Sequence, residues 1–263
     1  MSSRPIGVFD SGVGGLSILH ELRHLMPQEH CVFLADQAHV PYGEKTAEQL
    51  KDLACRITQF LLDQHCKLVV VACNTATCYA IETLRTKFTV PFVGTIPAVK
   101  PACEKTQNGV VAVLSTPATA QSPALHALID TYGKNKKVLA IGCAGLEDAV
   151  ETGSLHSSET LLLLKKYLAP AQHAGADYIV LGCTHYPFLR EKIQALVGPT
   201  IHLIDSGAAI ARQTARLLAV QHIQNPSFRK GSTRYFTTGD KKLFATVASG
   251  LLGKPIEAMH AVL

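Results

Sequence analysis

Short apolar runs recur along the chain and alternate with stretches of helical periodicity. Uninterrupted apolar runs with polar residues at their ends are typical of strands that are buried on both faces. Strands of this kind form parallel sheets that are covered by helices on both sides. The runs lie at 6–9, 32–35, 68–72, 92–94, 110–114, 138–141, 178–182, 201–204 and 234–238. We therefore predict an α/β fold.

The segments between these runs predict the helices. Leucines at positions 16, 19, 22 and 25 fall on one side of a helix over 17–25, and Thr46 is suited to cap a helix over 46–64. Further helices are expected at about 74–87, 157–169 and 208–221, with a short one after Asp240. In parallel sheets with such helices, ligands bind beyond the carboxyl ends of the strands. The residues just after each strand are therefore the candidates for chemistry.

The two halves of the chain resemble each other. Cys73 and Cys183 each follow a buried strand and are expected to open a helix, and they lie 110 residues apart. Asp10 in the first half corresponds to Ser115 in the second. A repeat of this length indicates a duplicated domain. We expect two similar α/β domains related by a pseudo-twofold axis, 1–96 plus 208–263 and 97–207, with the active site between them.

The composition narrows the functional classes. Hydrophobic residues make up 47% of the chain, which excludes a disordered protein. A net charge of +5, scattered along the sequence, argues against a dedicated nucleic-acid binder but is compatible with a small anionic ligand. No apolar run is long enough to span a bilayer. The start lacks the apolar stretch of a secretory signal, so we expect a cytoplasmic protein whose eight cysteines are reduced.

The paired cysteines carry the strongest functional signal. A single cysteine after a strand is most often an inert core residue. A thiol at a helix N-terminus, however, lies in a field that favours the thiolate, and here the pattern occurs twice, at Cys73 and Cys183. Two facing thiols suit racemisation, because one group removes a proton from a carbon and the other delivers one to the opposite face. A disulfide switch and a Cys-His acyl transferase are the alternative chemistries.

Other candidates each have a structural alternative. The turn 10–15 is rich in glycine, and Asp10 there either caps this tight turn or binds an ammonium group or orients a thiol. The loop 41–43 is either a plain turn or a wall of the substrate site. Thr116 and Thr119 are suited to helix capping, and Glu151 to a solvated helix face. His185 is of interest only because it lies two residues from Cys183.

Six blocks of sequence together resemble the glutamate racemases of the cofactor-independent aspartate/glutamate racemase superfamily. They run in the family's order across roughly 200 residues: IGVFDSGVGGLS (6–17), ADQAHVPYGEKT (35–46), VVACNTAT (70–77), VGTIPAVKPA (93–102), LGCTHYPFL (181–189) and IDSG (204–207). The departures are local: Cys143-Ala144-Gly145 replaces a common CPxx segment, and Ser115 and Gln121 differ from the usual residues.

The resemblance implies a two-domain α/β racemase. It implies that Cys73 takes the proton from D-glutamate and Cys183 from L-glutamate, with Asp10, His185 and Glu151 supporting catalysis. The substrate-binding residues that it implies are Asp10, Ser11, Pro41, Tyr42, Gly43, Cys73, Asn74, Thr75, Thr116, Thr119, Cys183, Thr184 and His185.

The resemblance also implies L- and D-glutamate as substrates, supply of D-glutamate for bacterial peptidoglycan, and a homodimer. We expect no cofactor and no metal, because no lysine stands in a recognisable pyridoxal phosphate site and no ligand cluster is apparent. Neither nucleic acid nor membrane is an expected partner. The alternatives are an aspartate racemase or another thiol-pair racemase of the same superfamily and, from a different class, a non-catalytic amino-acid-binding protein, which would need no thiols.

Overall fold

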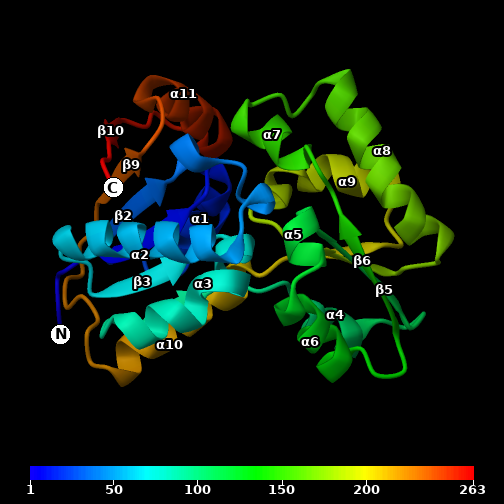
Figure 1. The fold of residues 1–263 in the computed structure, drawn as a ribbon, viewed down its shortest axis with the longest axis horizontal. Coiled ribbons are helices and arrows are strands. Elements are labelled where there is room, and N and C mark those ends of the chain that lie inside the picture. Colours follow the sequence, from blue (N-terminus) through cyan, green and yellow to red (C-terminus); the bar gives the residue numbers. More distant parts are fainter. The chain divides into compact units, whose positions relative to one another are not determined.

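The computed structural model describes all 263 residues, which form two compact units (Figure 1). The first unit consists of Met1–Thr95 and Gly207–Leu263, and the second of Ile96–Ser206. The boundaries expected from the sequence lie one residue further along the chain at both junctions. Both units are α/β, and every strand pairing in the two sheets is parallel, as predicted.

The first unit contains a six-stranded sheet in the order β10-β9-β2-β1-β3-β4. Its strands are β1 (Ile6–Asp10), β2 (Cys31–Ala35), β3 (Leu68–Val71), β4 (Phe92–Gly94), β9 (Thr233–Thr237) and β10 (Ala258–His260). Its helices are α1 (Leu16–Leu25), α2 (Ala47–Asp63), α3 (Asn74–Lys87), α10 (Gly207–Val220) and α11 (Lys241–Leu252). The C-terminal strands β9 and β10 extend the sheet beyond β2, so both ends of the chain contribute to one core.

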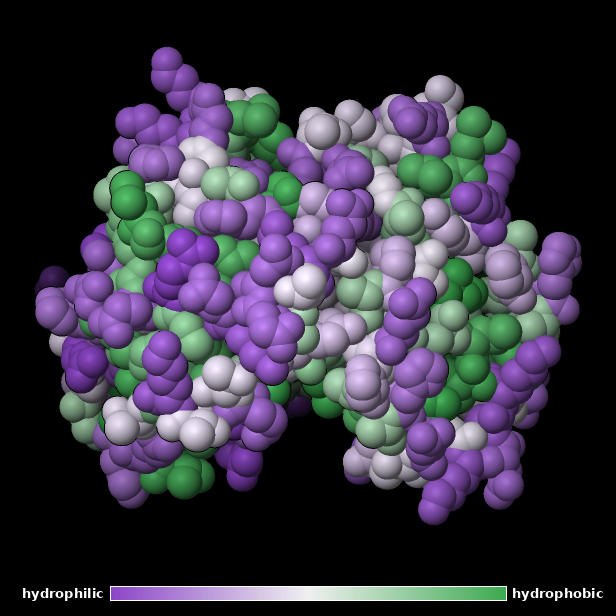
Figure 2. Space-filling view, in the orientation of Figure 1, coloured by the Kyte–Doolittle hydropathy of each residue, from purple (hydrophilic) through white to green (hydrophobic).

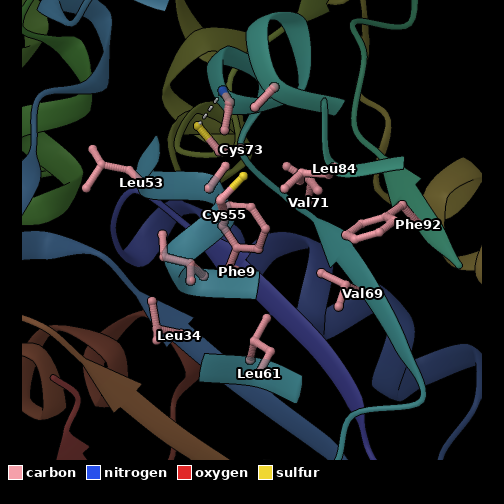
Figure 3. Packing of buried hydrophobic residues seen from close by; sticks show 14 of the residues in the cluster. Phe9, Leu34, Leu53, Cys55, Leu61, Val69, Val71, Cys73, Leu84 and Phe92 are labelled. Atoms are coloured by element: carbon pink, nitrogen blue, oxygen red, sulfur yellow. Dashed lines mark hydrogen bonds between the residues drawn. The ribbon is translucent and has the colours of Figure 1, made fainter. Parts of the chain in front are cut away.

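Alternate residues of the buried strands face two different helix layers. On one face, Phe9, Val69 and Val71 pack with residues of α2 and α3, such as Leu61 and Leu84 (Figure 3). On the other face, Phe33 stacks against Phe244 of α11 at 6.2 Å between ring centroids. Burial of each such side chain contributes about 1.5–3 kcal/mol. This packing explains why the strands read as continuous apolar runs, with no polar alternation.

Two helix starts illustrate how local chemistry sets the boundaries. Thr46 caps α2 as predicted, and its side chain forms a capping box with Gln49. The helix predicted to start at Ser17 begins one residue earlier, at Leu16, and follows a 3-10 turn over Val13–Gly15. No side chain caps α1 itself, whereas Asp10 caps the preceding turn, as the sequence suggested, by accepting from the backbone N–H of Gly12.

The second unit contains a four-stranded sheet in the order β6-β5-β7-β8. Its strands are β5 (Val110–Ser115), β6 (Lys137–Gly142), β7 (Tyr178–Leu181) and β8 (His202–Ile204). Its helices are α4 (Val99–Lys105), α5 (Pro117–Ala120), α6 (Pro123–Tyr132), α7 (Leu146–Glu151), α8 (Ser158–His173) and α9 (Arg190–Val197). The sequence indicated α8 with bounds. It indicated a helix start near Thr116 and a helix at Glu151 without bounds, and α5 and α7 lie there. It did not indicate α4, because a segment of this length shows too little periodicity.

The parallel strands direct their carboxyl ends to one edge of each sheet. In the first unit, Asp10, Asp36 and Cys73 lie at the ends of β1, β2 and β3. In the second, Ser115 ends β5, and Cys183 follows β7 after one glycine. These edges are where α/β proteins place their ligands.

One face of the molecule shows no segregation of polar and apolar residues. Figure 2 shows hydrophilic and hydrophobic residues interspersed over both units. None of the helices combines the length and the apolar character that spanning a membrane requires.

Candidate functional site

Cys73 occupies the N-cap position of α3, directly beyond β3. Its Sγ accepts a hydrogen bond from the backbone N–H of Ala76 at 3.4 Å (Figure 3). The side chain is buried, so little water competes for this contact. Hydrogen bonding by backbone N–H and the positive end of the helix both stabilise negative charge on the sulfur. The prediction that Cys73 follows a strand and opens a helix is confirmed.

Ser11 connects Cys73 to a buried carboxylate. The Cys73 thiol donates to Ser11 Oγ at 3.8 Å, and the Ser11 hydroxyl donates to Asp10 Oδ1 at 2.9 Å. A serine hydroxyl has a single hydrogen, so Ser11 donates either to Asp10 or to a Cys73 thiolate. The contact therefore adapts to both protonation states of the thiol.

The glycine-rich turn allows Asp10 to lie at this place. Asp10 is fully buried, and its Oδ1 also accepts from the backbone N–H of Gly12 at 3.2 Å. A Cβ on Gly15 would lie 2.6 Å from the Cβ of Asp10. Only glycine therefore permits this close approach, and the carboxylate both caps the turn and accepts from Ser11.

Asp36 is a further polar residue at the same sheet edge, and no sequence pattern pointed to it. Its Oδ2 accepts from the Tyr42 hydroxyl at 2.6 Å, and its Oδ1 accepts from Thr238 Oγ1 at 2.8 Å and lies 2.7 Å from His39 Nδ1. Asp36 is fully buried. The signal that identifies it is its position directly after β2, beside the selected Asp10 after β1.

The loop 41–43 is held by this carboxylate. Pro41 precedes a 3-10 turn over Tyr42–Glu44 that includes Gly43, and Tyr42 is buried. Burial raises the pKa of the Tyr42 hydroxyl well above its usual value, and the charges of Asp36, Cys73 and Asp10 raise it further. Tyr42 thus remains a hydrogen-bond donor at all physiological pH values. The role of the loop as a substrate wall stays a prediction.

Asn74 and Thr75 form the first turn of α3, and both are buried. The Asn74 amide donates to the carbonyl oxygen of Thr95 at 3.3 Å. This bond ties the start of α3 to the residue after β4, so it helps to fix the position of Cys73.

Cys183 differs from Cys73 in its local structure. The sequence predicted that it opens a helix, and this is wrong: residues 183–185 form a turn, followed by a 3-10 turn over Tyr186–Leu189. Pro187 lies in the first positions of that 3-10 turn, where its missing N–H is tolerated. Cys183 therefore has no helix N-terminus of its own.

Cys183 contacts a histidine side chain instead of a helix N-terminus. Cys183 Sγ lies 3.4 Å from Nδ1 of His185, whose Nε2 lies 2.7 Å from Oε1 of Glu151 at the end of α7. With the Nε2 proton held by Glu151, Nδ1 can accept the thiol proton or donate it back. The sequence-based link between His185 and Cys183 is confirmed as a contact.

The surroundings of His185 favour its protonated form. Burial alone would lower the pKa of His185, but the negative charge of Cys183 and the hydrogen bonds to Cys183 and Glu151 raise it well above its usual value. A protonated imidazole beside the sulfur stabilises a thiolate. The three side chains therefore form a unit that can bind and release one proton.

The remaining candidates of the second unit lie at the same sheet edge. Thr116 caps α5, and its hydroxyl donates to Thr119 Oγ1 at 3.1 Å. The capping role of Thr116 is thus present, whereas a role in substrate binding stays a prediction. Thr184 is buried beside Cys183. No group of three or more His, Cys, Asp or Glu side chains is arranged to hold a metal ion.

Comparisons with known proteins identify the family of this chain. The family model for Asp/Glu/Hydantoin racemase matches residues 16–214. The chain belongs to the Asp/Glu/Hydantoin racemase family. It is 47% identical to a glutamate racemase from Herpetosiphon aurantiacus over 247 residues, which cover 94% of this chain and 97% of the relative.

Solved structures give the same result. A glutamate racemase from Bacillus anthracis matches with a TM-score of 0.92 at 29% identity, covering 100% of this chain and 99% of that one. A glutamate racemase from Escherichia coli, crystallised with L-glutamate and the activator UDP-MurNAc-ala, matches with a TM-score of 0.87 at 34% identity and covers 99% of both chains. The fold predicted from the sequence is thereby confirmed.

The contact between Glu151 and His185 predicts a measurable change in titration. In Glu151→Gln, we expect the pKa of His185 to fall, because a neutral amide no longer stabilises the imidazolium. NMR titration of the imidazole carbon-bound protons measures this pKa, and a His185→Asn variant assigns the signal. The signals of exposed histidines should not change. A His185 titration that is the same in both proteins would show that Glu151 does not control this proton.

Proposed function

We propose that this chain interconverts L- and D-glutamate by moving a proton at Cα between two thiols, Cys73 and Cys183. The observation that carries the proposal is the pair of buried cysteines beyond β3 and β7, each with a neighbour that stabilises the thiolate. The identity to glutamate racemases supports glutamate as the substrate.

The protons of the reaction balance because both catalytic groups are cysteines. One cysteine begins as a thiolate and removes the Cα proton, and the other begins as a thiol and delivers its proton to the opposite face. The electron pair left on Cα delocalises into the substrate carboxylate, where hydrogen-bond donors stabilise it. After one turnover the two sulfurs have exchanged protonation states, so the enzyme is prepared for the reverse reaction. Proton exchange with solvent resets it.

In this proposal, each direction of the reaction uses a different base. Cys73 removes the proton from D-glutamate and Cys183 removes it from L-glutamate, as the family resemblance implies. Ser11 and Asp10 serve Cys73, since Ser11 accepts from the thiol. His185 and Glu151 serve Cys183. We also propose that the hydroxyls of Thr75, Thr116, Thr119 and Thr184, the amide of Asn74 and the loop 41–43 bind the substrate.

The biological setting is part of the proposal. The matched relatives are bacterial, and D-glutamate is a component of bacterial peptidoglycan, so we propose that the chain supplies this precursor. All eight cysteines are free, which agrees with a reducing compartment such as the cytoplasm. The family resemblance supports a homodimer.

The two alternatives differ in what they require. An aspartate racemase would use the same thiols. This chain, however, is 47% identical over nearly its whole length to a glutamate racemase. A non-catalytic amino-acid-binding protein would need no buried thiols with proton-accepting neighbours.

Substrate choice is tested by chiral chromatography of the purified chain with L-glutamate and L-aspartate. We expect D-glutamate to form and kcat/KM for aspartate to be lower by at least about tenfold, since one methylene in a pocket changes specificity by about 10–200-fold. Activity should persist after dialysis against a chelator and hydroxylamine, because the two thiols carry out both proton transfers. Comparable turnover of both amino acids would contradict the assignment to glutamate.

The two thiols are tested by Cys73→Ala and Cys183→Ala. Either substitution should reduce racemisation in both directions by at least about 100-fold, because each direction needs one base and one acid. Cys66→Ala in the first unit and Cys103→Ala in the second are the matched controls, since both remove buried thiols, Cys66 before the start of β3 and Cys103 within α4. The controls should keep most of the activity. Substantial racemisation by either test variant would refute the pair.

A further inference from the structure

A cavity of about 380 Å³ lies in the first unit, at the sheet edge opposite to Cys73. It is lined by the last two turns of α1, by the segment leading into β9, and by residues 254–256 after α11. Thr233 is the first residue of β9, whereas Cys73 follows the last residue of β3. Because the sheet is parallel, these two positions belong to opposite edges. The cavity is therefore separate from the site proposed above.

The lining of this cavity is basic. Five of its side chains are basic: His20, Arg23, His24, Lys230 and Lys254. No acidic side chain lines it. Arg23 and His24 also lie in the last turn of α1, where positive charge compensates the helix dipole. That effect does not account for the two lysines, which come from other segments.

The nearest buried carboxylate does not neutralise these charges. Glu29 is buried, and its Oε2 lies 2.7 Å from Lys67 Nζ, while its Oε1 accepts from the backbone N–H of Asn225 at 2.7 Å. Both carboxylate oxygens are thus engaged elsewhere. The side chains of His20, His24, Lys230 and Lys254 form no ion pair and no hydrogen bond in the structure.

One cation of the cavity is held in a fixed position. The guanidinium of Arg23 donates to the backbone carbonyl oxygens of Glu29 and Gly231. A guanidinium has five N–H donors, so further donors remain for a ligand. Tyr235 adds a hydroxyl to the lining, and burial raises its pKa, which keeps it a donor. A fixed guanidinium with flexible lysines around it is an arrangement that suits oxyanions.

We propose that this cavity binds a small phosphate-type polyanion. A ligand with two or more negative charges would neutralise the two lysines and Arg23, which otherwise repel one another. It would connect α1, the segment before β9 and the segment after α11. The volume suits a phosphate or diphosphate group with a small substituent.

The test uses inorganic pyrophosphate as the probe, measured by isothermal titration calorimetry at low ionic strength. We expect saturable binding to the unchanged chain and about tenfold or greater weakening in Lys230→Gln/Lys254→Gln. The matched control is Lys165→Gln/Lys166→Gln, which removes two exposed lysines of α8 in the second unit. The control should bind pyrophosphate as the unchanged chain does.

A second measurement follows the thermal midpoint. Pyrophosphate should raise the Tm of the unchanged chain and of the control, but not that of the Lys230/Lys254 variant, because a ligand stabilises only the state that binds it. Sodium chloride of equal ionic strength should not reproduce the rise. Absence of saturable binding to the unchanged chain, or equal weakening in both double variants, would overturn the proposal. Racemisation of glutamate should be the same in all three proteins, so this test is independent of the proposed reaction.

Discussion

A cysteine must be a thiolate to act as a base, but burial disfavours the charged thiolate. The proposed chemistry depends on contacts that stabilise the thiolate in spite of burial. Within this chain, burial raises the pKa of the Cys66 and Cys143 thiols to about 12 and that of Cys31 to about 11. A thiol in such surroundings is protonated at neutral pH and does not remove protons. A cysteine at a buried sheet edge is therefore inert unless donors near its sulfur stabilise the thiolate.

Cys143 shows that position at the sheet edge is not sufficient. It follows β6, as Cys183 follows β7, but its thiol donates to the carbonyl oxygen of Ile141 at 3.5 Å, a partner that favours the protonated form. Cys73 instead accepts from the N–H of Ala76, and Cys183 contacts the imidazole of His185. Hydrogen bonds from the backbone of Ser115 and from Tyr186 lower the pKa of the Cys143 thiol, but burial outweighs them.

The two sulfurs have different surroundings. Cys73 lies at a helix N-terminus and donates to Ser11, whereas Cys183 contacts His185, which is hydrogen-bonded to Glu151. The first arrangement provides fixed dipoles and the second provides a group that itself titrates. We infer that both sulfurs must be able to accept and to release a proton, but that their surroundings need not be the same.

The limits of prediction from the sequence follow from the same physics. The parallel strands and the long helix α2 were predictable, since continuous apolar runs and the capping residue Thr46 are local signals. Cys73 and Cys183 were predictable because each follows such a run. The contact of Asp36 with Thr238 was not, because it joins segments 202 residues apart that only the folded chain brings together.

The isotope content of the first product tests the two-thiol account most directly. The enzyme is incubated with L-glutamate in D₂O, and the Cα hydrogen of product and remaining substrate is followed by NMR during the first turnovers. The thiol that delivers the new proton has exchanged with solvent, so D-glutamate should carry deuterium from the start, while remaining L-glutamate gains little. Substantial retention of the original hydrogen in early D-glutamate would show that one base serves both faces, and would contradict the account.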